Sequence, residues 1–254
     1  MTDAIRTEVV DRTLVVTLDR PEARNAVNLA MAEQVAAAMQ RLDEDEDLSV
    51  GVLTGAGGTF CAGMDLKAFA TGELPVVPER GFAGLTSQPP RKPLIAAVEG
   101  YALAGGLEVV LACDLVVAAR SAVFGIPEVR RGLVAGAGGL LRLPQRVPYH
   151  LAMEWALTGE HVPAARAHEA GLVNRVCEPG ESLAVALELA AVIAANAPLA
   201  VRASKQVIAE SRDWPQAEWF DRQHEVTRAV SRSADAMEGA VAFAEKRAPR
   251  WQGR

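Results

Sequence analysis

The chain has 254 residues and half of them are hydrophobic, so it can bury a large core as one big domain or as one domain with an appendage. A net charge of -6 provides no basic surface for nucleic acid, so any phosphate group on a ligand must be met by local cations. The three cysteines lack CxxC spacing, which indicates neither a disulfide framework nor a zinc knuckle and fits a reducing compartment.

The first half of the chain alternates apolar runs with glycine-containing turns. Asn28 is expected to cap a helix that continues to about Glu44, with an apolar residue at every third or fourth position. Apolar or β-branched runs predict five strands, at residues 13–18, 50–54, 94–98, 115–118 and 122–124. This repeated order of strand, turn and helix predicts an α/β architecture with right-handed crossovers.

After about residue 140 the strand signals fade and helical patterns take over. Several of the helical segments have a proline near their start, where its missing N–H is harmless. The expected helices cover residues 148–157, 163–170, 181–196, 198–211, 215–231 and 234–247, interrupted only by the segment 172–176. Residues 71–90 contain four prolines and are the best candidate for a mobile loop that shapes an active-site mouth.

The glycine-rich turns at residues 55–58 and 136–139 complete neither a dinucleotide-binding motif nor a P-loop. The four histidines lie in the helical half at no metal-ligand spacing. The N-terminal segment lacks a signal-peptide pattern, and the longest apolar region, 101–119, is interrupted by Glu108 and Asp114. We therefore expect a cytoplasmic protein without a metal, a nucleotide cofactor or a membrane partner.

Two glutamates in apolar surroundings are the candidates for chemistry. Glu108 follows two glycines, on a helix expected to start at about Ala104, and Glu128 follows a proline. A buried structural carboxylate is the alternative for Glu108, and a first-turn acid favoured by the helix dipole is the alternative for Glu128. Asp65 and Asp114 are interpreted as structural. Two carboxylates with two glycine turns predict acid/base chemistry beside a pair of aimed backbone N–H groups.

Motifs that follow one another along nearly the whole chain resemble those of one family. They are DRPEARNA at 19–26, TG at 54–55, FCAGMDL at 60–66, KPLIAAVEG at 92–100, GGLE at 105–108, FGIPE at 124–128, GAGG at 136–139, LTG at 157–159, GLVN at 171–174 and FAEKR at 243–247. In this order they resemble the crotonase superfamily, and the similarity is close to enoyl-CoA hydratases. The motifs are specific for the superfamily and much less specific for the substrate.

This resemblance implies a fold and an assembly. The fold is α/β, a spiral of repeated ββα units over residues 1–195 that carries the acyl-CoA site. A helical C-terminal region over residues 196–254 is expected to form a homotrimer or a dimer of trimers. The resemblance also implies an oxyanion hole in which the backbone N–H groups of Ala62 and Gly105 hold the carbonyl of an acyl-CoA thioester.

The resemblance further implies that water adds across the 2,3-double bond of a trans-2-enoyl-CoA. Glu108 is expected to act as the base on the water, Glu128 as the acid that protonates the α-carbon, and the Gly136 amide as the group that orients the water. Coenzyme A is part of the substrate, so neither a cofactor nor a metal is expected. The residues implied to contact the CoA moiety are Arg24, Ala62, Gly63, Met64, Asp65, Leu66, Gly105 and, from a neighbouring subunit, Phe243 and Lys246, with Lys67 or Lys92 near the phosphates.

Some features leave alternatives open. The glycine usual before the oxyanion turn is Ala104, and the proline usual before Gly136 is Ala135. The segments 129–135 and 140–144 resemble a branch with carnitinyl-CoA dehydratase-like proteins. A Δ3,Δ2-enoyl-CoA isomerase, another crotonase lyase and a non-catalytic acyl-CoA-binding protein are the remaining candidates, and the presence of both glutamates is evidence against the last.

Overall fold

The computed structural model describes residues 4–254, so the first three residues of the N-terminal segment used above lie outside it. A six-stranded sheet with the order β1-β2-β3-β6-β8-β11 is its central layer. The strands β1 and β2 pair antiparallel, and every pair from β2 onward is parallel. The strands are β1 (Ile5–Val10), β2 (Thr13–Leu18), β3 (Val50–Gly55), β6 (Leu94–Val98), β8 (Leu115–Ala119) and β11 (Arg175–Cys177).

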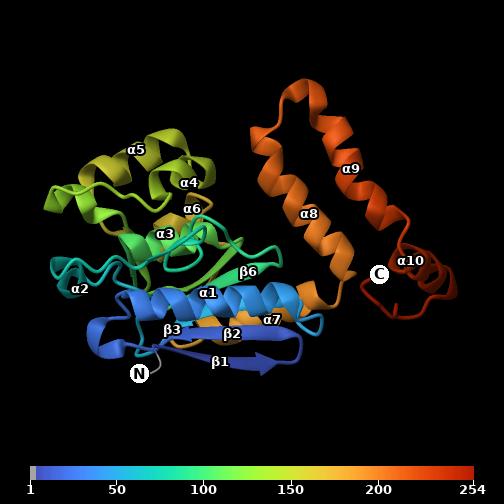
Figure 1. Cartoon of the computed structure of the whole chain (residues 1–254), viewed down its shortest axis with the longest axis horizontal. Coiled ribbons are helices and arrows are strands. Elements are labelled where there is room, and N and C mark those ends of the chain that lie inside the picture. Colours follow the sequence, from blue (N-terminus) through green and yellow to red (C-terminus); the bar gives the residue numbers. More distant parts are fainter. Residues whose placement is uncertain (1–3) are drawn as a thin grey trace.

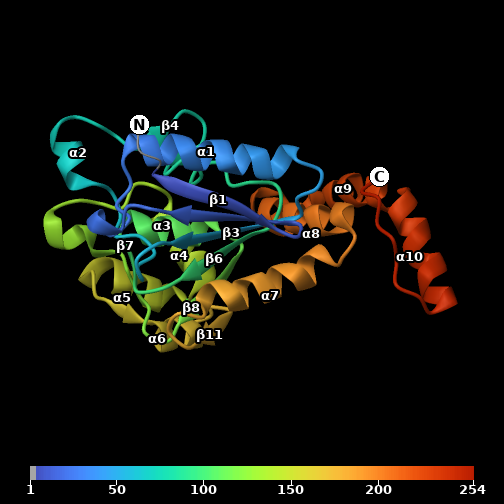
Figure 2. The same cartoon turned by 90° about the horizontal axis from the view of Figure 1, so that it is seen from below.

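The sheet is covered on both faces because its middle strands are apolar throughout. Leu14 and Val16 of β2 belong to the cluster that includes the buried face of α1 (Leu29–Glu44). Val15, between them, belongs to a second cluster formed with α7 (Ser182–Ala194). Alternate residues of a strand point to opposite faces, so one strand serves both clusters. Figure 2 shows α1 and α7 on opposite sides of the sheet.

A second layer lies next to the sheet and carries the remaining short elements. Helix α3 (Gly105–Ala112) is buried along its whole length. A three-stranded sheet contains β7 (Tyr101–Leu103), β9 (Val123–Gly125) and β10 (Val162–Pro163), and β4 (Val76–Val77) pairs with β5 (Gly81–Phe82). The helices of this part are α2 (Leu66–Ala70), α4 (Gly139–Arg146), α5 (Tyr149–Thr158) and α6 (Ala164–Glu169), with 3-10 turns η1 (Pro21–Ala23) and η2 (Pro127–Arg131).

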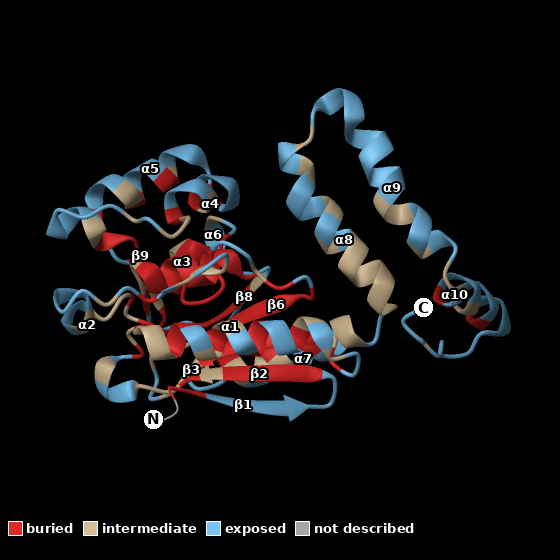
Figure 3. Cartoon of the chain, in the orientation of Figure 1, coloured by how far each residue is buried: buried red, intermediate tan, exposed pale blue. Residues whose placement is uncertain are grey.

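The C-terminal helices stand beside this body rather than on it (Figure 1). They are α8 (Pro198–Glu210), α9 (Trp219–Ser231) and α10 (Ala234–Glu245), with 3-10 turns η3 (Ser211–Asp213) and η4 (Gln216–Glu218). Neither α8 nor α9 has a buried residue, and Figure 3 shows α9 mostly in the colour of exposed residues and α8 in the colours of intermediate and exposed residues. Lys205 ties α8 to the body, because its ammonium donates to the Asp114 carboxylate (2.5 Å) and to the Lys92 carbonyl (3.0 Å).

The α/β architecture expected from the sequence is confirmed, and the differences lie in the short elements. Asn28 caps α1 as predicted, accepting a hydrogen bond from the Met31 amide (3.0 Å). Strand β1 was not predicted, and the segment 172–176, which was expected to interrupt the helices, overlaps strand β11 at 175–177. The expected loop at 71–90 contains β4 and β5. The division of the chain at residue 195 stays a prediction.

Among the described residues no single helix is long and apolar enough to cross a membrane. One pair of helices, 182–194 with 198–213, passes the same test of length and composition when taken together, and it is bent by 108° at its break.

Candidate active site

The first turn of α3 is built on close backbone contacts that require glycine. A side chain at Gly106 would place its Cβ 2.2 Å from the Cys61 carbonyl oxygen, and one at Gly105 would lie 2.6 Å from the Phe82 ring. Ala104 precedes them with φ 52° and ψ −126°, a backbone conformation that an L-residue adopts only with strain. As the first residue of α3, Gly105 has an N–H with no partner in its own helix, so this N–H is available to a ligand.

The segment before α2 supplies a second free amide, and it is not the one expected. The Ala62 N–H donates to the Arg24 carbonyl (3.0 Å), which corrects its assignment to the oxyanion hole. Within residues 4–254 the Met64 N–H has no acceptor. A Cβ placed on Gly63 would lie 3.2 Å from the Gly105 nitrogen, so the Gly63–Met64 peptide lies next to the α3 terminus. The pair of free amides is therefore that of Met64 and Gly105.

Glu108 projects from the first turn of α3 and is only 3% exposed. Its Oε1 accepts hydrogen bonds from the amides of Ala137 (2.7 Å) and Gly139 (2.9 Å). Burial raises the pKa of Glu108, while the two amides and the nearby Arg142 guanidinium act in the opposite direction. Gly139 has to be glycine, because a Cβ there would approach Glu108 Cγ to 2.9 Å.

Glu128 lies in η2 and its carboxylate is held differently. Its Oε2 is buried and has no hydrogen-bond partner among the described residues. Burial raises the pKa of Glu128 to about 7, and the Glu108 carboxylate adds to the rise. The two glutamates therefore have unequal environments: amides and a guanidinium favour the anion at Glu108, whereas Glu128 holds its proton near neutral pH.

One large cleft, of about 2200 Å³, brings these groups together. It is lined by both glutamates, by Met64 and by Gly105, and it extends to α8 and α9. The cleft thus places two carboxylates and two backbone donors around one volume. That arrangement can polarise a carbonyl and move protons to and from the carbon atoms beside it.

The remaining predicted residues differ in whether they line the cleft. Ala62, Leu66 and Gly136 line the cleft as well, and the Gly136 amide has no acceptor among the described residues. Gly63 is buried beside Gly105. Arg24 is exposed and does not line the cleft.

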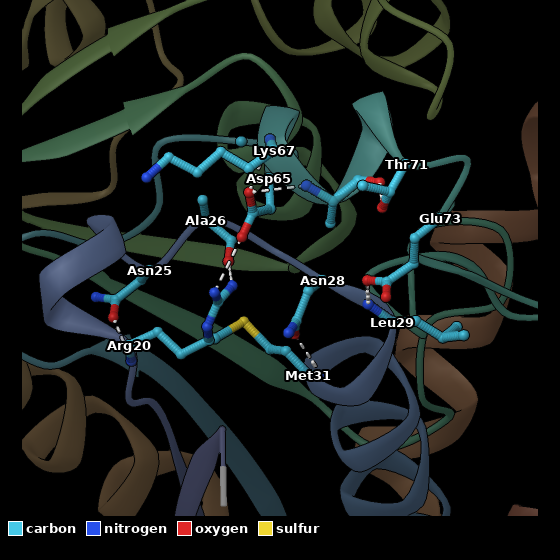
Figure 4. A network of polar contacts seen from close by, with 12 residues as sticks. Arg20, Asn25, Ala26, Asn28, Leu29, Met31, Asp65, Lys67, Thr71 and Glu73 are labelled. Carbon is cyan, nitrogen blue, oxygen red and sulfur yellow. Dashed lines mark hydrogen bonds and ion pairs between the residues drawn. The ribbon is translucent and has the colours of Figure 1, made fainter. Parts of the chain in front are cut away.

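The Asp65 carboxylate, expected to contact CoA, is occupied within the chain. It accepts from Arg20 (2.9 Å) and from the Lys67 and Ala68 amides, as Figure 4 shows for the network around it. This agrees with the structural interpretation of Asp65. Lys67 is exposed, whereas Lys92 is 6% exposed, does not line the cleft and donates from its ammonium to the Asp45 carbonyl (2.6 Å).

Phe243 and Lys246 lie at the end of α10, on the far side of α8 and α9 from α3 (Figure 1). The Phe243 side chain is 88% exposed, and neither residue lines the cleft of its own chain.

Several residues of the site were missed by sequence reasoning. The amides of Ala137 and Gly139 hold Glu108, Phe82 covers Gly105, and Arg142 lies against Gly138 while donating to the Thr86 carbonyl (2.6 Å). The glycines at 138 and 139 were a signal for a tight turn, but nothing in the sequence shows which carboxylate that turn approaches.

Comparison with known proteins gives a consistent result. Residues 10–254 match the family model described as enoyl-CoA hydratase/isomerase. An enoyl-CoA hydratase of Mycobacterium tuberculosis is 46% identical over 250 residues, covering 95% of this chain and 94% of the relative. A carnitinyl-CoA dehydratase of Proteus mirabilis is 41% identical over 249 residues, covering 95% of each.

Solved structures agree with these relatives. The crystal structure of an enoyl-CoA hydratase from Mycobacterium tuberculosis H37Rv has a TM-score of 0.98 and 60% identity, covering 99% of this chain and all of the other. That of a carnitinyl-CoA hydratase from Mycobacterium avium has a TM-score of 0.80 and 44% identity, with both chains fully covered. The expected crotonase-type fold is confirmed.

Proposed function

Because the chain belongs to the enoyl-CoA hydratase/isomerase family, we propose that it is a hydro-lyase that adds water reversibly across the 2,3-double bond of a trans-2-enoyl-CoA. The observation that carries this proposal is an unequal pair of glutamates that line one cleft together with the residues of two free amides. Neither a metal nor a cofactor is needed for this reaction, because coenzyme A is part of the substrate.

The Met64 and Gly105 amides would hold the thioester oxygen. Adding water at C3 makes C1 and C2 enolate-like, and negative charge builds up on that oxygen in the transition state. Backbone donors fixed before the reaction stabilise such charge without reorganising, and the N-terminal end of α3 adds its dipole. We therefore assign the oxyanion hole to Met64 and Gly105 in place of Ala62 and Gly105.

The glutamates divide the proton transfers between them. Glu108, whose Oε1 accepts from two amides, takes a proton from water as the oxygen bonds to C3, and Glu128 gives its proton to C2. The net transfer is from Glu128 to Glu108, and exchange with solvent restores the starting state. The Gly136 amide, free and lining the cleft, is proposed to orient the water.

An uncharged acyl chain fits this cleft better than the acyl group of carnitinyl-CoA. Arg131 and Arg142 line the cleft and interact electrostatically with Glu128 and Glu108, respectively. A trimethylammonium group would meet these like charges, which disfavours it.

The test is turnover with a series of 2-enoyl-CoA thioesters of increasing chain length, with mass analysis of each product. We expect a product heavier by one water. An isomer of unchanged mass from a 3-enoyl-CoA, with no hydration of the 2-enoyl-CoA, would show the isomerase instead. Acyl-CoA binding without turnover would show a binding protein.

We further propose that the active particle has a multiple of three subunits and lies in the cytoplasm. The exposed apolar residues of α8 to α10 support an assembly, and the three buried free cysteines fit a reducing compartment. In that assembly Phe243 and Lys246 reach the CoA moiety held by a neighbour. Light scattering measures the particle, and an active monomer would contradict this. Phe243→Ala should raise KM for the thioester about fivefold with kcat unchanged, as loss of ~1 kcal/mol of aromatic contact predicts.

A further inference from the structure

Arg20 lies close to the segment that contains Met64, one of the two proposed oxyanion donors. Its guanidinium donates hydrogen bonds to two different segments of the chain. Its Nη1 donates to the Ala26 carbonyl (2.6 Å) and its Nη2 to the Asp65 carboxylate (2.9 Å). Figure 4 shows the guanidinium pointing toward both acceptors. One acceptor belongs to the segment before α1 and the other to the segment before α2, so Arg20 joins them.

These two segments are paired on either side of Met64. Val27 donates its N–H to the Gly63 carbonyl (2.8 Å), and its own carbonyl accepts from the Asp65 N–H (2.9 Å). Both of Arg20's acceptors are direct neighbours of this pairing, because Ala26 precedes Val27 and Asp65 follows Met64. Displacing either one would loosen the bridge between Val27 and Met64.

The direction of the Met64 N–H follows from that bridge. In a planar trans peptide the carbonyl and the N–H point to opposite sides. Since the Gly63 carbonyl points to Val27, the Met64 N–H has to point away from Val27. The Gly105 nitrogen lies next to this peptide, 3.2 Å from a Cβ placed on Gly63.

The Arg20–Asp65 pair is better shielded than an ordinary surface ion pair. The two side chains are 20% and 14% exposed, whereas those of the Arg6–Asp19 pair are 65% and 28% exposed. Burial opposes the ionisation of Asp65, but Arg20 and the Lys67 and Ala68 amides lower its pKa below the usual range. The planar fork of arginine reaches two acceptors in fixed directions, which a lysine ammonium cannot reproduce.

We propose that Arg20 is a positioning residue for the thioester carbonyl: by holding the Ala26 carbonyl and the Asp65 carboxylate together, it fixes the direction of the Met64 N–H. Arg20 itself touches neither the substrate nor the reacting atoms. This inference rests on the proposed function, because it concerns the polarising half of that site.

The experiment measures carbonyl polarisation separately from turnover. The probe is a cinnamoyl-CoA with an electron-donating amino group on the ring, whose absorption band moves to longer wavelength when its carbonyl is polarised. Its band shift on binding is compared in wild type, Arg20→Met, Arg20→Lys and Asp65→Asn, together with kcat and KM for hydration. Arg6→Met, which breaks the exposed pair, is the matched control.

We expect Arg20→Met to lose at least half of the band shift and between ~10-fold and ~10²-fold in kcat, with little change in KM. The expected loss in kcat does not exceed the loss caused by deleting one oxyanion donor, because the substitution misaligns the Met64 amide and does not remove it. Arg20→Lys and Asp65→Asn should fall between Arg20→Met and wild type, and Arg6→Met should match wild type.

A full band shift in folded Arg20→Met would overturn the proposal, whatever happens to kcat. If Arg20→Met does not fold, Arg20→Lys and Asp65→Asn decide in its place, and a full band shift in both has the same consequence. A failure of the proposed function is distinguishable, because the wild-type protein itself would then give no band shift or no hydration. Glu108→Gln separates the two halves of the site: it should keep the band shift and lose turnover.

Discussion

Helix α3 buries its apolar side chains, whereas the pair formed by α8 and α9 exposes several of them. All of α3 is buried, including Glu108, whereas α8 and α9 contain no buried residue and expose Ile208 (68%) and Phe220 (73%). One copy of the chain is therefore enough to bury Glu108, whereas the apolar side chains of its C-terminal helices remain exposed to solvent. We infer that the chemistry belongs to one subunit and that CoA binding depends on a second one.

The strongest test of the first half of this comparison is to remove the carboxylates. Glu108→Gln and Glu128→Gln should each lower kcat for crotonyl-CoA hydration by at least ~10²-fold, the loss expected when a general acid or base is removed. The double variant should fall little further than the worse single variant, because the two groups act on one step. Steady-state kinetics on all four proteins measures this.

The matched control is Glu33→Gln on the exposed side of α1, which should keep full activity. Full activity in either active-site variant, with the fold intact by circular dichroism, would remove that glutamate from the mechanism.

The pH dependence tests the asymmetry within the buried pair. In the proposed mechanism hydration requires Glu128 to carry a proton, and its pKa is raised to about 7, so kcat/KM should fall about tenfold per pH unit well above that value. The folded state also holds this proton more tightly than the unfolded chain, so stability should decrease as pH rises from about 4.5 to about 7. In the Glu128→Gln variant, the part of this decrease in stability that comes from residue 128 should be absent. A flat rate profile up to pH 9 would contradict the assignment of Glu128 as the acid.

The second half of the comparison is tested by placing a charge on the uncovered helices. Phe220→Asp in α9 should weaken assembly by ~10-fold or more, since burying one phenylalanine contributes about 1.5–3 kcal/mol. Light scattering over a dilution series would show smaller particles, with a higher KM for the thioester. Gln223→Asp, at an exposed polar position of the same helix, is the control. Unchanged assembly in Phe220→Asp would place the subunit contact elsewhere.

A smaller effect, on the free energy of unfolding, should distinguish the backbone before α3 from the backbone of α8. Ala104→Gly relieves the strain at φ 52° and ψ −126°, so we expect a gain of about 1 kcal/mol in the free energy of unfolding. Ala203→Gly, inside α8, should instead cost about 1 kcal/mol, because glycine weakens a regular helix. Thermal denaturation compares the two, and destabilisation by Ala104→Gly would show that the turn is not strained.

Sequence reasoning predicted the long periodic elements and the two carboxylates, because burial leaves a pattern along the chain. The Asn28 cap and the strands β2, β3 and β6 follow from such local patterns. Strand β1 was missed because most of its residues are exposed.

The proposed oxyanion donors depend on contacts between distant segments. Ala62 and Met64 flank the same glycine, and the sequence does not show which of their amides is free. That is decided by Arg24, whose carbonyl takes the Ala62 N–H, and by Val27, which pairs on either side of Met64. The amides that hold Glu108 were missed for the same reason, since they come from a turn about thirty positions further along.

The use of backbone amides at Met64 and Gly105 gives the two halves of the site different tolerance to mutation. Every amino acid except proline has the same N–H, so residue 64 can vary without loss of the polarising group, provided that the path of the chain is kept. Positions 108 and 128 have no such freedom, because their function resides in the side chain. A substitution at residue 64 should therefore leave the carbonyl polarised, whereas a substitution at residue 108 or 128 should change the proton transfers.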